Sequence, residues 1–209
     1  MQHTITFADV HRVKRHAKKI KVDFPDLPHS KRLDKAAVEI CGARNFHELN
    51  RWFERAINQH VDTPDGPNSV SHCRYCDFRF AADHKPDQKA HREFHEAFME
   101  AEEKLAYRPG TYVERERMKK DGYHQMNHGE HEEDRVAGLL MVTRGWFDRS
   151  LSLAIEAGCW SKHPTFEVFV AMMVPHLETM DLELSMLLAE RYGRTSGAIK
   201  TGQTIWSAR

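Results

Sequence analysis

Apolar residues recur at steps of three and four along the first sixty positions of the chain, and each run predicts an amphipathic helix. The first helix covers residues 7–21, with basic side chains at its outward positions. A second helix is expected to start with Ser30 as its N-cap and to end at Gly42, and a third to start with Asn45 as its N-cap. Two short helices joined through a glycine have the layout of a helix-turn-helix. Residues 1–60 are therefore predicted to form a basic, helix-turn-helix-like unit of three helices.

The helical period stops after these sixty residues and returns in the last third of the chain. Residues 61–71 hold two prolines and a glycine among small polar side chains, which predicts a linker. Further on, one long helix is expected to end at Gly158 and a partner helix to begin at Pro164, with a kink near Pro175. The two helices are predicted to pack as an antiparallel hairpin within a helical region of residues 109–192.

Two segments beside this hairpin have weaker patterns. Residues 112–120 predict a short, charged helix that ends at Gly122. Residues 193–209 lose the helical period, which predicts a flexible tail with Trp206 as a small anchor. The hairpin itself carries a methionine-rich stripe, which suits either a buried core or an adaptable surface for a protein partner or a second copy of the chain.

Candidate chemistry lies between these helical regions, in residues 72–108, where cysteine and histidine stand at metal-ligand spacing. The pattern is C-x2-C-x14-H-x3-H, and its four ligands are Cys73, Cys76, His91 and His95. A tight knuckle places two thiolates on one side of an ion, and one helical turn places two imidazoles on a single face, so the four donors complete a tetrahedron around zinc. Because no coordination position stays open for water, such a zinc site is structural and not catalytic.

The residues between the ligands fit a ββα zinc finger with an extended helix. Phe78 and Phe80 alternate as a short hairpin strand requires, and Asp87 is the expected N-cap of the helix that carries both histidines. Phe94 and Phe98 share a helix face with those histidines and would cover the ion. The alternative is that the two ligand pairs occur together by chance in a chain with 15 histidines.

A resemblance to a known family rests on residues 71–99. Besides the four ligands, the segment has a set of aromatic, small and acidic residues at fixed positions: Phe78, Ala82, Asp87, Phe94 and Phe98. This pattern resembles the zinc finger of the sister-chromatid cohesion acetyltransferases, and the resemblance implies zinc ligation by the same four side chains. It does not imply acetyl transfer, because residues 194–198 depart from the R/Q-x-x-G-x-G/A loop with which that family binds coenzyme A.

Charge is unevenly distributed along a chain whose 31 basic and 31 acidic side chains balance. Residues 1–60 hold twelve Lys or Arg against seven Asp or Glu, so this part is where a polyanion such as DNA would bind. The candidate nucleic-acid-binding residues are Arg12, Arg15, Lys18 and Lys19 on the first helix and Asn45 and Arg51 on the third. The alternative is a packing unit whose charge is only a solvated surface.

Within this basic part, residues 42–49 read G-A-R-N-F-H-E-L. The segment resembles short helical units of poorly characterised plasmid and phage proteins. The resemblance implies a protein of a bacterial mobile element.

Composition narrows the class of protein further. The 209 residues are 40% hydrophobic and 30% charged, and no apolar run approaches the roughly 18 residues of a membrane span. The start of the chain has no apolar signal-peptide core, so a cytoplasmic protein without a membrane partner is expected. Cys41 and Cys159 are expected to be buried free thiols, as in a reducing compartment.

A second histidine group raises the possibility of an enzyme. His124, His128 and His131 would share one face of a helix and could hold a second metal with an open position, as in a metal-dependent hydrolase. Against this, Gly122 and Gly129 weaken a helix through the run, which favours a solvated loop and helix start.

Three functions are compatible with these patterns. The first is a non-enzymatic, DNA-associated regulatory or accessory protein with one structural zinc ion. The second is an inhibitor or adaptor that binds another protein, and the third is the hydrolase. No catalytic residues are identified, because no nucleophile, nucleotide-binding or paired-carboxylate motif is found.

Overall fold

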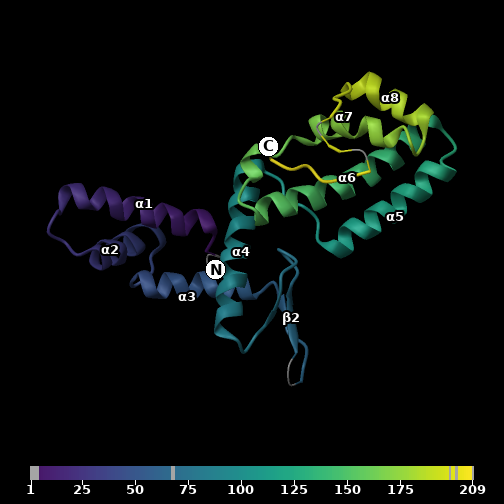
Figure 1. Ribbon diagram of the computed structural model, residues 1–209. Helices are drawn as coiled ribbons and strands as arrows, with labels where there is room; N and C mark the ends of the chain where they lie inside the picture. The colour runs from purple at the N-terminus through teal and green to yellow at the C-terminus, as the bar shows by residue number, and fades with distance from the viewer. Residues whose placement is uncertain (1–4, 67–68, 198, 201, 209) are drawn as a thin grey trace. The chain divides into compact units, whose positions relative to one another are not determined.

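The chain is mainly helical and divides into two compact units. The structure, a computed structural model, describes residues 5–66, 69–197, 199–200 and 202–208. These residues form eight α-helices and one three-stranded antiparallel sheet (Figure 1), which confirms the prediction of a mainly α protein. The first unit spans residues 1–106 and the second residues 107–209. Among the described helices, none combines the length and apolar character that a bilayer crossing requires.

The first unit begins with the three predicted helices, α1 (Phe7–Asp23), α2 (His29–Cys41) and α3 (Phe46–Asn58). Their apolar faces meet in one core, in which Val13, Leu49 and Phe53 are fully buried. The core forms because each helix carries its apolar residues on one stripe, so that three stripes can exclude water together.

The ends of these helices agree with local sequence signals in all but one case. Thr6 caps α1 in a reciprocal capping box, and Asn45 caps α3 by accepting a hydrogen bond from the Glu48 amide. Gly42 ends α2 in the left-handed conformation, with φ of 68°. The predicted cap of α2 at Ser30 is wrong, because the helix starts one residue earlier and its N-cap is Pro28, which has no side-chain acceptor.

The small sheet follows α3. Its strands are β1 (Val61–Asp62), β2 (Val70–Cys73) and β3 (Arg79–Ala81), in that spatial order. β1 pairs with the end of β2, and β2 pairs with β3 through a hairpin. The segment predicted as a linker, residues 61–71, therefore contributes β1 and the start of β2. Backbone pairing with the hairpin orders it, which is a long-range contact that composition does not reveal.

The long helix α4 (Lys85–Leu105) links the sheet to the helical core. Its N-cap is His84 and not the predicted Asp87, whose carboxylate instead accepts hydrogen bonds from the Ala81 amide and the His84 ring. Further along α4, Met99 packs against the core of α1 to α3. Sheet and helical core thus belong to one compact unit.

The second unit contains four α-helices. They are α5 (Tyr112–His128), α6 (Glu132–Glu156), α7 (Phe166–Leu177) and α8 (Leu182–Tyr192), and Figure 1 shows α5 and α6 lying side by side. The dominant antiparallel pair is α5 with α6, whereas the sequence predicted α6 with the helix that follows it. The prediction that α5 ends at Gly122 is wrong, since the helix continues through this glycine.

Glycine explains the close α5–α6 contact. A Cβ on Gly122 would lie 2.7 Å from the backbone oxygen of Gly138, and a Cβ on Gly138 would lie 2.4 Å from the backbone nitrogen of Met126. Only hydrogen atoms fit between the two backbones here. Tertiary packing therefore keeps a helix at a position where intrinsic propensity disfavours it.

A buried carboxylate fixes the approach to α5. Asp148 of α6 accepts a hydrogen bond from the Gly110 amide at 3.0 Å and another from the Tyr107 hydroxyl. Burial raises the pKa of Asp148, while these two hydrogen bonds act in the opposite direction. Burial and the nearby Asp148 also raise the pKa of Tyr107.

The expected single helix from Pro164 is in fact two helices, α7 and α8. Pro175 lies inside α7, and the chain leaves the helix two residues after it. Asp181 then caps α8 by accepting a hydrogen bond from the Leu184 amide at 3.0 Å. Proline and an N-cap close behind it together replace the predicted kink with a break.

The methionine-rich stripe is largely core. Met173 and Leu177 on α7 and Leu184 and Leu188 on α8 are all fully buried. The tail also contacts this unit, because the Trp206 amide donates a hydrogen bond to the Ser150 hydroxyl. The predicted anchor at Trp206 is thus present.

The glycine contact gives a direct stability prediction. We expect Gly138→Ala to lower the free energy of unfolding by roughly 1–3 kcal/mol, because the new methyl group meets backbone atoms that cannot move independently. Gly145→Ala on the same helix is the matched control, since its methyl group would meet the flexible side chain of Lys119 at 2.5 Å. Urea unfolding of both variants measures the difference. Equal stability of the two would contradict the close-contact account.

Candidate metal centre

The turn between β2 and β3 places two cysteine side chains together. Cys73 ends β2, and its amide donates a hydrogen bond to the Phe78 carbonyl at 2.9 Å. Asp77 adopts the left-handed conformation, with φ of 64°, and its amide donates to the Cys73 carbonyl at 2.8 Å. Its side chain bonds the His72 ring. These bonds hold a tight turn that brings the Cys76 thiol to the same side as that of Cys73.

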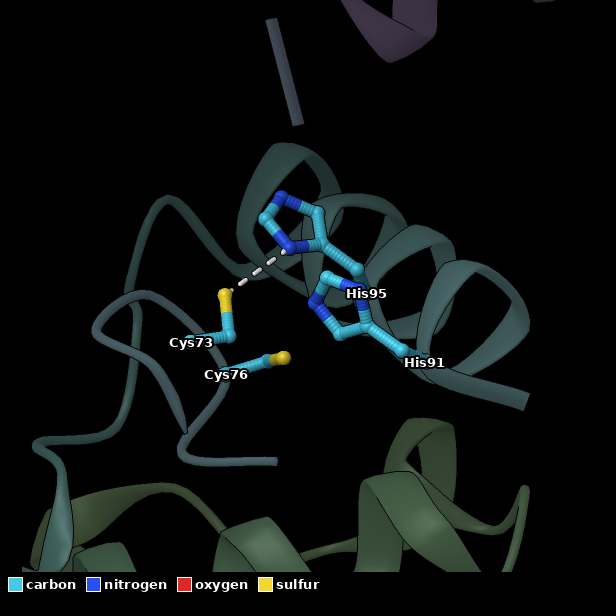
Figure 2. Close-up of side chains that lie close together, drawn as sticks. All are labelled: Cys73, Cys76, His91 and His95. Carbon is cyan, nitrogen blue, oxygen red and sulfur yellow. Dashed lines mark hydrogen bonds between the residues drawn. The ribbon is translucent and has the colours of Figure 1, made fainter. Parts of the chain in front are cut away.

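Helix α4 supplies two imidazoles opposite this turn. His91 and His95 are one turn apart, so both rings project from the same face of α4. Figure 2 shows the two thiols and the two rings pointing toward one another. One ligand atom from each residue lies within 4.8 Å of the other three, so the predicted set is brought together. We call Cys73, Cys76, His91 and His95 the Cys2His2 cluster.

Burial of this cluster is almost complete. The exposed fraction of each of the four residues is 3% or less. The Nε2 atom of His91 has no hydrogen-bond partner among the described residues, although it is buried. A buried, unpaired nitrogen costs about 1–3 kcal/mol, which a bound metal ion would offset. The donor set and the unpaired nitrogen therefore both fit a metal ion.

Electrostatics at the cluster also favour a cation. The Cys76 thiol donates a hydrogen bond to the Cys73 sulfur, and this bond together with those from His91 and His95 lowers the pKa of Cys73. The same shared proton, with burial, raises the pKa of Cys76. One thiolate thus forms readily and the second thiol holds its proton. A divalent cation would displace that proton, because a metal-bound thiol is deprotonated.

Aromatic rings shield the cluster from water. Phe80 stacks on His91 with ring centroids 4.4 Å apart, and Tyr75 stacks on His95 at 4.5 Å. The Tyr75 hydroxyl in turn donates a hydrogen bond to Glu102, farther along α4. These contacts fix the orientation of the imidazoles and enclose the site. Four protein donors in a dry environment are typical of a structural metal site.

The second predicted metal group is not assembled. His124 and His128 lie on α5 with ring centroids 4.9 Å apart, whereas His131 is the N-cap of α6, beyond the extended Gly129. Within the described parts of the chain, the Cys2His2 cluster is the only group of three or more His, Cys, Asp or Glu side chains with metal-binding geometry. The hydrolase hypothesis therefore lacks its ligand set.

The predicted nucleic-acid-binding residues fall into different environments. Arg12 forms an ion pair with Asp9, and Asn45 is committed to capping α3. Arg51 is exposed on α3, and Lys19 is exposed on α1.

Arg15 and Lys18 line a groove of about 320 Å³ on the three-helix part. Sequence reasoning did not select Lys14, which lines the same groove, because it treated that position as part of the apolar stripe. The helical period would have revealed it, since Lys14 and Lys18 are one turn apart.

Comparisons with protein families, with curated proteins and with solved structures find no match to this chain. The site is therefore interpreted from its own geometry.

The cluster predicts one metal ion for each chain. Cys76→Ser should abolish stoichiometric binding, because serine replaces a soft thiolate donor with a neutral hydroxyl. Cys159→Ser is the matched control, since Cys159 is a free cysteine outside the cluster. Elemental analysis of protein purified without chelators measures the bound metal. A metal-free wild-type protein, or a full equivalent of metal in Cys76→Ser, would contradict the assignment.

Proposed function

We propose that this chain is a non-enzymatic, DNA-associated regulatory or accessory protein whose first unit is stabilised by one structural zinc ion. The observation that carries the proposal is that the closed Cys2His2 cluster and the helix with the unpaired cations belong to the same compact unit. Such a metal would organise a binding surface without taking part in chemistry.

Zinc is the ion that best suits the donors. Two thiolates and two imidazoles form the tetrahedral set that zinc commonly occupies, whereas calcium and magnesium require oxygen ligands. The resemblance of residues 71–99 to a zinc finger supports the same ion. Because all four donors come from the protein, zinc would have no open position for a substrate or a reactive water.

Helix α4 is a poor candidate for reading DNA directly. Its outward face carries Glu96, Glu100 and Glu103, which would repel phosphate groups. Near its start, Arg92 is committed to ion pairs with Glu54 and Glu96. In this proposal the finger therefore supports the fold, and DNA contacts lie elsewhere in the unit.

Helix α1 provides the phosphate contacts in this proposal. Arg15, Lys18 and Lys19 are exposed, and no ion pair or hydrogen bond of their side chains is found within the described ranges. Unpaired cations release counterions from a nucleic acid at the smallest cost, because no internal ion pair has to break. The resemblance of residues 42–49 to plasmid and phage helical units supports a role in a bacterial mobile element, and therefore in the cytoplasm.

A second candidate, binding to another protein through the second unit, is favoured by one observation. Leu182 and Met186 lie one turn apart on α8, with exposed fractions of 61% and 62%. Large apolar side chains exposed next to one another are common at interaction surfaces.

Salt dependence of binding tests the proposed function. We expect the affinity for a DNA oligonucleotide to fall with a log-log slope of about −0.7 to −0.9 for each phosphate contact. The double reversal Lys18→Glu and Lys19→Glu should weaken binding strongly. The matched control reverses Lys120 and Arg149, two exposed cations of the second unit. Absence of binding at low salt, or equal effects of the two double variants, would contradict the proposal.

A further inference from the structure

The groove on the three-helix part has an unusual charge. Its volume is about 320 Å³, and Lys14, Arg15 and Lys18 line it from α1. His11 of α1 and His29 of α2 add two imidazoles, and no acidic side chain lines it. We call this the cationic groove. Three permanent positive charges without a neighbouring carboxylate are suited to an anion.

The cations of the groove differ from other basic groups of the same part. Arg12 is paired with Asp9, and His16 lies 2.7 Å from Glu39. Neither Lys14 nor Lys18 has an ion pair or a side-chain hydrogen bond in the part of the chain that the structure describes. Internal carboxylates thus neutralise the other positions and leave the charge of the groove free.

The start of α2 adds to this positive potential. His29, the first residue of α2, lines the groove. The N-cap Pro28 offers no side-chain acceptor, and the first turn of α2 contains no acidic residue. The amide groups at this helix start therefore keep their capacity to bind an anion, and the helix dipole acts in the same direction.

The cationic groove also has an apolar part. Leu33 of α2 and Phe46 of α3 line it, and both are only partly buried against the helical core. A groove for a simple inorganic anion does not need an apolar wall. Cations beside an aromatic ring are the combination with which proteins bind single-stranded nucleic acid, since the cations contact phosphate and the ring contacts an unstacked base.

We propose that the cationic groove accommodates one nucleotide of a single-stranded nucleic acid. Its phosphate lies against Lys14, Arg15 and Lys18, and its base contacts Phe46. The volume is at the lower end of the range of about 300–1,000 Å³ for ligand pockets, which suits one nucleotide. A duplex offers the same phosphates, but its stacked bases cannot reach the ring. The inference rests on the proposed nucleic-acid binding and specifies its site and its preferred strand form.

A charge-matched pair of variants tests the site. Lys14→Gln with Lys18→Gln removes two charges from the groove, and Lys19→Gln with Lys21→Gln removes two charges from elsewhere on α1. Fluorescence anisotropy with a single-stranded oligonucleotide and with its blunt duplex, over a range of salt concentrations, measures both affinities. We expect the groove variant to lower the single-strand salt slope by about 1.4, which corresponds to two lost phosphate contacts, and the control to leave the slope unchanged.

A third variant tests the base contact. Phe46→Leu keeps an apolar side chain at this position but removes the ring, and we expect it to weaken single-strand binding and to leave duplex binding unchanged. Its thermal unfolding and metal content check that the unit stays folded. If that variant unfolds, the preference of the wild-type protein for single strands over duplex remains as the readout.

Several outcomes would overturn the inference, and they differ from failure of the proposed function. Equal losses in the groove and control variants, or stronger binding of duplex than of single strands, would overturn the groove while nucleic-acid binding stands. Competition by poly-glutamate as effective as that by the oligonucleotide would assign the groove to an acidic protein. No binding of either strand form at low salt would overturn the proposed function as well.

Discussion

The Cys2His2 cluster is the contact on which the first unit depends, because it joins a sheet that cannot be stable alone to a helix that reaches the core. Strands β1 to β3 contain nine residues in all. Such a small sheet has too little apolar surface to hold itself together in water. The cluster ties its turn to α4, and α4 carries Met99 into the core of α1 to α3. A metal ion there would stabilise the whole unit and not the finger alone.

The second unit uses a different device. Its two longest helices meet backbone to backbone at Gly122 and Gly138, and a buried carboxylate at Asp148 fixes the entry to α5. Neither feature requires a metal. The chain thus combines a metal-dependent unit, in which a cationic surface lies free, with a unit that is stabilised by close helix packing. This division assigns the nucleic-acid hypothesis to the first unit and leaves the exposed face of α8 for a protein partner.

Features with a local cause could be predicted from the sequence. The four ligands follow from spacing alone, and the positions of α1 to α3 follow from the apolar period. Features with a tertiary cause could not. The helix through Gly122 depends on the approach of α6, and β1 depends on pairing with β2. The break between α7 and α8 depends on Asp181 acting as a cap. The cationic groove was partly found through Arg15 and Lys18, but its remaining wall comes from α2 and α3, which sequence distance hides.

Amide hydrogen exchange before and after removal of the metal by a chelator tests the central claim most directly. If the cluster holds the first unit together, the strands and α4 should lose most of their protection when the metal leaves, and the amides of α5 and α6 should keep theirs. Unchanged protection of β2, β3 and α4 in the metal-free protein would contradict the account.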